Sequence, residues 1–252
     1  MKIRIFIVML CFALGAQAQN ETLFVQATKA YNDGNFEKAA DYYQEILKNG
    51  KHSASLYFNL GNCHYKLNEI GPSIYYFEKA LLLRPNDPEI LNNLGYAQNM
   101  RLDAIDQMPE TPWSKLYNNL VNIMTFDQWA YLTVFLVLAF VIAYLLYYAL
   151  FGATQKRVMF VTSVVSLILA GLSVVFAYLQ WQDHLSDNPA IIFEREVVVA
   201  SEPNERSEKV FTLHEGTKVN VLETLNEWNK IWIADGQTGW IPAESLKLLK
   251  DF

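Results

Sequence analysis

The sequence predicts a multidomain membrane protein in three parts: an α-solenoid of short helical repeats, a hairpin of two transmembrane helices, and a small β-barrel. Three observations carry this prediction. In the N-terminal part, a pattern of aromatic, apolar and small residues returns after 34 residues. Two long apolar stretches without a charged residue follow, separated by six residues. Short runs of alternating polar and apolar residues then fill the C-terminal quarter of the chain.

Residues 1–18 have the features of a secretory signal peptide. Lys2 and Arg4 give a basic start, a short apolar run follows, and Ala16 and Ala18 fit a small-residue cleavage site. The apolar run is too short to serve as a stable transmembrane helix. This segment is therefore expected to direct export and to be removed from the mature chain.

Residues 20–102 repeat with a period of 34. Corresponding positions of successive units carry similar residues: Tyr31 and Tyr65, Phe36 and Ile70, Tyr43 and Phe77, and the runs 59–62 and 93–96, which read Asn-Leu-Gly-Asn and Asn-Leu-Gly-Tyr. Paired amphipathic helices at this period are the signature of tetratricopeptide repeats, which the chain resembles most closely at 54–87. The units are expected at 20–53, at 54–87 and, as a partial unit, at 88–102.

The resemblance implies a concave groove that binds extended peptides or partner helices. Family position places six side chains toward this groove: Asn59, Asn62, Tyr65, Asn92, Tyr96 and Asn99. Asparagine side chains can pair with the backbone amides of a partner because they both donate and accept hydrogen bonds. The alternative is that these residues are solvated surface. The basic clamp with which some family members hold C-terminal carboxylates is not evident, and Glu89 argues against it.

Residues 103–126 are expected to form a linker with one amphipathic helix. Pro112 follows Thr111, as at the first position of a helix. Apolar residues then recur at helical spacing: Trp113, Leu116, Tyr117, Leu120, Val121 and Met124. Two placements fit this pattern, a cap on the repeats and a position in the membrane interface.

Two segments, 127–152 and 158–180, are expected to cross the inner (cytoplasmic) membrane as an antiparallel hairpin with a cytoplasmic loop at 153–157. Each contains an uncharged stretch of more than 20 residues, which is enough for the hydrocarbon core. Lys156 and Arg157 lie in the loop, so the positive-inside rule places it in the cytoplasm. The signal peptide agrees, and both soluble parts are expected outside the cytoplasm. No ionisable residue interrupts the apolar stretches, which argues against a transporter.

Residues 189–252 are expected to form the barrel, because short alternating runs are separated by turn signals. The stretch resembles bacterial Src-homology-3-like domains. The residues that carry the resemblance are the run 213–219, the pair Trp228 and Lys230, and the run 235–242.

Such domains often bind peptidoglycan or peptides. The resemblance makes Trp228 and Trp240 a candidate ligand surface. The alternative interpretation assigns at least one of Trp228 and Trp232 to the barrel core. The opening loop at 202–207 departs from the usual family pattern, which puts ligand binding through that loop in doubt.

Several functional classes are disfavoured. The net charge of −6, without a dense cluster of lysine and arginine, argues against nucleic acid as a partner. The four histidines are scattered without a metal-binding spacing, and the sequence contains neither a nucleophile elbow nor a phosphate-binding loop. No catalytic, metal or cofactor site is therefore expected, and the protein is not expected to be an enzyme. Cys63 is expected to be a buried helical residue.

The order of the parts, with the run 125–130 at the entry to the first span, resembles the BatE proteins of the Bacteroidetes aerotolerance (Bat) operon. That resemblance implies membrane partners with von Willebrand A domains, a MoxR-type ATPase, and a role in aerotolerance or envelope stress. The expected function is a membrane-anchored protein–protein interaction scaffold of the cell envelope. Two alternatives stay open: a cell-wall sensor that binds peptidoglycan through the barrel, and a membrane assembly factor that acts through its helical hairpin.

Overall fold

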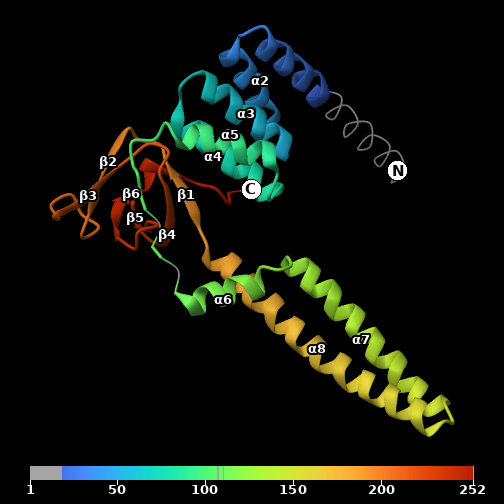
Figure 1. Cartoon of the computed structure of the whole chain (residues 1–252). Helices are drawn as coiled ribbons and strands as arrows, with labels where there is room; N and C mark the ends of the chain where they lie inside the picture. The colour runs from blue at the N-terminus through green and yellow to red at the C-terminus, as the bar shows by residue number, and fades with distance from the viewer. Residues whose placement is uncertain (1–18, 107, 110, 252) are drawn as a thin grey trace, which may run out of the picture. The chain divides into compact units, whose positions relative to one another are not determined.

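The computed structural model describes residues 19–106, 108–109 and 111–251. Within them the chain divides into two compact units (Figure 1). One unit joins the N-terminal helices, before residue 108, to the C-terminal sheet, from residue 188 onward. The other unit comprises residues 108–187. The expected signal peptide lies outside the described residues.

Antiparallel helices form the N-terminal part of the first unit. They cover residues 19–32, α2 (Phe36–Lys48), α3 (Ala54–Lys66), α4 (Ile70–Leu83) and α5 (Pro88–Gln98). Ser53 caps α3 by accepting a hydrogen bond from the Leu56 amide at 3.2 Å, and Asp87 caps α5 from the residue before Pro88. Each cap satisfies amide groups that the first turn of a helix leaves unpaired. Residues 99–106 contain no second helix to pair with α5, so the array is two and a half helix pairs.

Residues 188–251 form one antiparallel sheet with the strand order β3-β2-β6-β5-β4-β1-β7. The strands are β1 (Pro189–Ile192), β2 (Glu196–Ala200), β3 (Lys209–His214), β4 (Lys218–Leu225), β5 (Trp228–Trp232), β6 (Thr238–Pro242) and β7 (Leu246–Leu248). A short 3₁₀ turn, η1 (Ala243–Ser245), precedes β7. Among the described residues, β3 and β7 are the edges and do not pair with each other. The sheet is therefore open, which corrects the closed barrel that the sequence suggested.

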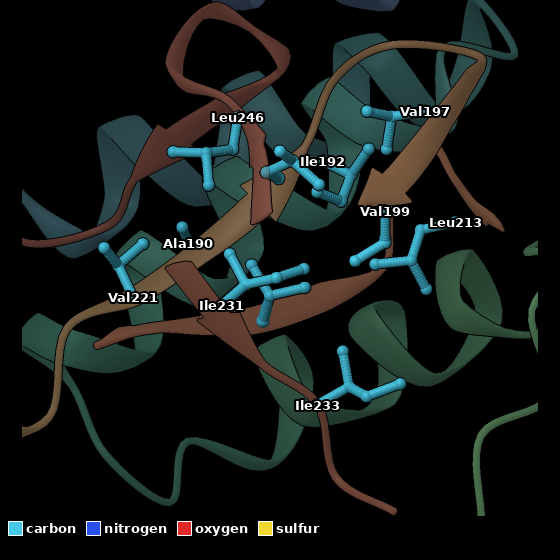
Figure 2. Packing of buried hydrophobic residues seen from close by; sticks show 11 residues of the cluster. Ala190, Ile192, Val197, Val199, Leu213, Val221, Ile231, Ile233 and Leu246 are labelled. Carbon is cyan, nitrogen blue, oxygen red and sulfur yellow. The ribbon is translucent and has the colours of Figure 1, made fainter. Parts of the chain in front are cut away.

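The core of this sheet is aliphatic. Figure 2 shows Ile231 and Val199 among the central side chains of this cluster, and Ile233 at its lower edge. Successive side chains of a strand point to opposite faces, so burying Ile231 and Ile233 turns Trp232 outward. Trp232 is 39% exposed and Trp228 is half-buried. The prediction that one of these tryptophans belongs to the core is therefore wrong.

The sheet packs directly against helix α4. Ile191 of β1 and Leu249, both fully buried, share one core with Ile74 and other residues of the helices. Two glycines allow this close approach. A Cβ on Gly71 would lie 3.2 Å from a backbone oxygen of β1, and one on Gly216 would lie 2.8 Å from the Ile74 side chain. Gly216 also has a φ of +81°, a conformation that side chains disfavour.

Polar contacts complete this interface. Lys218 donates a hydrogen bond to the buried Glu78 carboxylate at 2.7 Å. Asp103, in the segment after α5, accepts bonds from the Thr217 hydroxyl at 2.6 Å and from the His214 backbone amide at 2.7 Å. Burial alone would raise the pKa of Asp103, but its hydrogen bonds from Thr217 and His214 outweigh burial and lower that pKa. The repeats and the sheet are therefore one folded body rather than two modules on a flexible tether.

A buried lysine lies at the same interface. The Lys79 side chain is 5% exposed and forms an ion pair with Asp251 near the C-terminus. Its ammonium group also stands 5.0 Å from the centre of the Tyr57 ring and 5.2 Å from that of Tyr75. An ion pair and two aromatic faces compensate for the water that this cation loses on burial.

The second unit contains three helices, α6 (Pro112–Val121), α7 (Phe126–Ala149) and α8 (Ala153–Ser186). Helices α7 and α8 are long and apolar enough to cross a membrane. They pack along each other through small residues of α8, and the hydroxyl oxygens of Thr133 and Ser173 lie 2.5 Å apart. Residues 153–157, expected to be the loop, instead form the first turn of α8, and the link shortens to 150–152.

Candidate functional site

The main candidate site is a groove on the repeats with a volume of about 340 Å³. Its walls come from the first, third and fifth helices of the array, with one residue from α4. The lining residues are Tyr31, Asn62, Tyr65, Lys66, Phe77, Asn93 and Tyr96. The groove is present while the sheet is packed against α4, so docking of the sheet does not close it.

The structure brings three of the six predicted groove residues together in this lining: Asn62, Tyr65 and Tyr96. The Asn93 side chain donates a hydrogen bond to the Asn62 side-chain oxygen at 2.9 Å, which links α3 to α5 across the groove. Tyr96 is 55% exposed, so most of its ring is available to a ligand. These positions combine aromatic surface with amide groups.

The other three predicted residues lie elsewhere. The Asn59 side chain hydrogen-bonds the hydroxyl of Tyr43 and contributes a lowering effect on its pKa, although burial raises that pKa overall. Asn92 is exposed on α5, outside the lining. Asn99 is the C-terminal cap of α5 and is also outside the lining. None of these three contributes to the groove surface.

Sequence reasoning missed four lining residues, and the repeat itself held the signal for one of them. Equivalent positions of successive repeats tend to present their side chains to the same surface, and Tyr31 stands 34 positions before Tyr65. Asn93 stands 34 positions after Asn59, but Asn59 does not line the groove. Phe77 corresponds to Tyr43, which is buried outside the lining, and Lys66 corresponds to Asn32, so the repeat gave no sign that either residue lines the groove.

The chemistry of the groove suits an extended polypeptide. Tyrosine rings offer flat surface at low entropic cost, and the amides of Asn62 and Asn93 offer both donors and acceptors. Among the described residues of the lining, the ammonium of Lys66 supplies the formal charge. An arrangement of this kind can contact the backbone and the apolar side chains of a peptide.

A second hollow, of about 310 Å³, lies on the sheet. Its apolar lining residues are Trp228, Pro242, Val197, Val198 and Ala200, and Glu194, Glu196 and Glu205 are among its polar ones. Trp240, the other predicted ligand residue, does not line it. The Trp240 ring lies instead beneath the ammonium of Lys230, 5.8 Å from the ring centre. The two predicted tryptophans therefore do not line one hollow, although the register of β5 and β6 places them on the same face of the sheet.

The described part of the chain contains no cluster of metal-ligating side chains. No three histidine, cysteine, aspartate or glutamate side chains come together there in a way that could hold a metal ion. Cys63 is fully buried, and burial raises the pKa of its thiol to about 12. A thiol with this pKa is a poor nucleophile at neutral pH.

Comparison with known proteins identifies two modules. Residues 199–247 match the bacterial SH3 domain, and residues 54–87 match the tetratricopeptide repeat. An 82-residue stretch is 34% identical to the Protein CTR9 homolog of Arabidopsis thaliana, over 31% of this chain but 8% of that protein. The chain thus spans a small fraction of the length of that relative. It combines a tetratricopeptide repeat and a bacterial SH3 domain with two helices suited to crossing a membrane.

Proposed function

We propose that this protein is a membrane-anchored scaffold of the cell envelope whose repeat groove binds a segment of a partner protein. The observation that carries the proposal is the groove itself, with Asn62, Tyr65, Asn93 and Tyr96 on one open surface. Both modules are of kinds that typically bind other molecules rather than catalyse reactions. Protein partners follow from the repeats, and a cell-wall ligand is suggested by the bacterial SH3 domain.

The proposed setting is the inner membrane, with both soluble parts outside the cytoplasm. The two apolar helices support insertion, and Lys156 and Arg157 at their connected end support a cytoplasmic turn. The order of modules supports a place in a Bat complex with von Willebrand A domain proteins and a MoxR-type ATPase, in aerotolerance or envelope stress. A groove that holds an extended segment suits a membrane protein partner in such an assembly.

The contact between repeats and sheet refines how such a scaffold works. The polar contacts of the sheet go to α4 and to the segment after α5, whereas the groove is lined mainly by the other helices. The groove and the sheet surface are therefore held at a fixed distance, and two weak contacts to one assembly reinforce each other. A rigid arrangement also avoids the entropy cost of ordering a flexible linker on binding.

The test is crosslinking and affinity capture from native membranes. The double variant Asn62→Ala with Tyr96→Ala removes an amide and a largely exposed ring from the groove. Leu91→Ala is the matched control, because Leu91 is 47% exposed on the same helix α5 but outside the lining. Loss of specific membrane partners with the double variant, and retention with Leu91→Ala, is the expected result. Unchanged capture of partners by the double variant would show that the groove is not the surface that binds them.

The hollow beside Trp228 favours a second function, binding of a cell-wall or peptide ligand. Aromatic stacking by Trp228 and carboxylates at its rim suit a ligand that carries an amine, such as a stem peptide. Retention of the intact protein on purified peptidoglycan tests this function. Trp228→Ala should abolish retention, whereas Trp232→Ala, an exposed tryptophan outside the hollow, should not. Equal retention of all three proteins, or none by the unaltered one, would reject it.

A further inference from the structure

We propose that the exposed apolar side of α6 lies in the lipid surface, so that this helix is an interfacial membrane anchor beside the hairpin. The proposal rests on the hairpin crossing a membrane and is independent of any partner in the repeat groove. The sequence left two placements open for this helix. The structure puts it in the same compact unit as α7 and α8.

The side chains of α6 fall on three faces. An exposed apolar stripe continues past the helix end and consists of Trp113, Leu116, Leu120 and Ile123, which are 80%, 49%, 44% and 64% exposed. A second face, with Tyr117 and the fully buried Val121, turns toward the hairpin. Lys115 and Asn119 lie on a third, polar face, about 100° around the helix from the centre of the apolar stripe.

Three hydrogen bonds fasten α6 and its C-terminal end to the hairpin. The indole nitrogen of Trp129 donates to the Val121 carbonyl at 3.0 Å. The Tyr117 hydroxyl donates to the Asp183 carboxylate at 2.7 Å, and Asn122 accepts from Gln180 at 3.3 Å. The first contact reaches the beginning of α7 and the other two reach the last turns of α8. These contacts fix the helix at the end of the hairpin opposite to Lys156 and Arg157.

The depth of α6 follows from where those contacts fall. Gln180 directly follows the last residue of the second apolar stretch, and Asp183 lies about 4.5 Å further along α8. Trp129 is the first residue of the apolar stretch of α7, two positions after Asp127. The residues of α7 and α8 that bind α6 therefore lie at the boundary between the hydrocarbon core and the headgroup region. A helix held at that level has its apolar side at the boundary that amphipathic helices occupy.

Lipid is the occupant that this surface fits best. The apolar stripe adjoins the face that packs on the hairpin, so it continues the exposed apolar surface of α7 and α8. Trp113 has the amphipathic ring that is enriched at membrane interfaces. The neighbouring polar face carries Lys115, whose charge favours anionic headgroups. Each feature matches a membrane surface, and none requires a second protein.

The experiment measures how deep labels on α6 lie in a lipid nanodisc. Nitroxide labels are attached in the full-length protein to Trp113→Cys, Ile123→Cys and, as the matched polar-face control, Asn119→Cys. Val137→Cys, in the middle of α7, reports whether the hairpin crosses the bilayer. Cys11 is replaced by serine, and Cys63 is fully buried, so we expect it not to label in the folded protein. Collision with oxygen reports lipid, and collision with a water-soluble nickel chelate reports solvent.

The expected result is that labels at 113 and 123 collide more with oxygen than with the chelate, and that the label at 119 shows the reverse. Solvent exposure at 113 and 123 equal to that at 119 would overturn the proposal. Protection of 113 and 123 from both reagents would also overturn it, because a protein surface would then cover them. Access of the nickel chelate to the label at 137 would show that the hairpin does not cross the bilayer and would reject the proposal. Partner capture through the groove would not be affected by that result.

Discussion

Replacing Gly61 with alanine places a methyl group where the ring of Phe77 stands. The new Cβ would lie 2.6 Å from Cδ1, 2.7 Å from Cε1 and 3.0 Å from Cγ of that ring. Ordinary carbon contacts are about 3.5–4.0 Å, so the ring must move by roughly 1 Å. Phe77 is fully buried, so a shift of its ring disturbs the core that packs around it. Gly95 is the equivalent residue of the next repeat and serves as the control, because a Cβ added there would meet no atom within 4 Å.

The two variants separate steric cost from backbone effects. Both variants replace a glycine inside a helix with alanine, and this replacement by itself stabilises the helix by about 1 kcal/mol. Overpacking a well-filled core costs about 1–3 kcal/mol, and only Gly61→Ala incurs it. The free energy of unfolding of Gly61→Ala should therefore lie about 1–3 kcal/mol below that of Gly95→Ala. This difference corresponds to roughly a 5- to 150-fold change in the opening equilibrium.

The thiol of Cys63 is the probe for this measurement, because Cys63 is two residues from Gly61 and fully buried. Its labelling by a thiol reagent, measured across a urea series on the full chain in detergent with Cys11 replaced by serine, reports opening of the repeats. Gly61→Ala should open at lower urea than the unaltered protein, and Gly95→Ala at equal or higher urea. Equal midpoints for the two variants would show that α3 and α4 do not approach as described.

Three further predictions concern the same unit. Because burial raises its thiol pKa to about 12, Cys63 should resist alkylation at neutral pH and react only when urea opens the repeats; rapid native labelling would refute this. The lowered pKa of Asp103 adds stability above about pH 4, and this stability is lost as the pH falls through the pKa of Asp103 in the folded protein. The difference in the free energy of unfolding between the unaltered protein and Asp103→Asn should therefore shrink in acid, and a difference that does not change with pH would contradict this. Gly216→Ala should loosen the sheet from α4 and expose both to limited proteolysis, whereas unchanged proteolysis would reject the close contact.

The elements that could be predicted from the sequence are those whose residues follow a regular spacing along the chain. The 34-residue repeat and the alternation of the strands both arise from local geometry, which the sequence records directly. Strand β1 has no alternation, because all four of its residues are buried, and its short apolar run carried no strand signal. The tryptophans of β5 were misplaced because hydrophobicity alone does not say which of two alternating faces is the core.

The packing of the sheet on α4 could not be predicted from the sequence, for a different reason. It joins residues that are more than 100 positions apart, such as Asp103 with Thr217 and Glu78 with Lys218. These pairs follow no period, and Gly71 and Gly216 look like ordinary turn or helix glycines in the sequence. Half of the predicted groove residues were correct. The repeat located Asn62, Tyr65 and Tyr96, whereas the presence of Asn93 rather than Asn92 in the lining depends on how α5 is rotated about its axis.

The most direct test of the scaffold function is whether a partner touches the groove. A photoreactive phenylalanine analogue at position 96, in the groove, is compared in native membranes with the same analogue at position 91, on α5 outside the lining. We predict a specific crosslinked membrane protein from position 96, which is lost when Asn62 is replaced by alanine, and none from position 91. The same crosslinks from both positions, or from position 91 alone, would contradict the assignment of the groove as the binding surface.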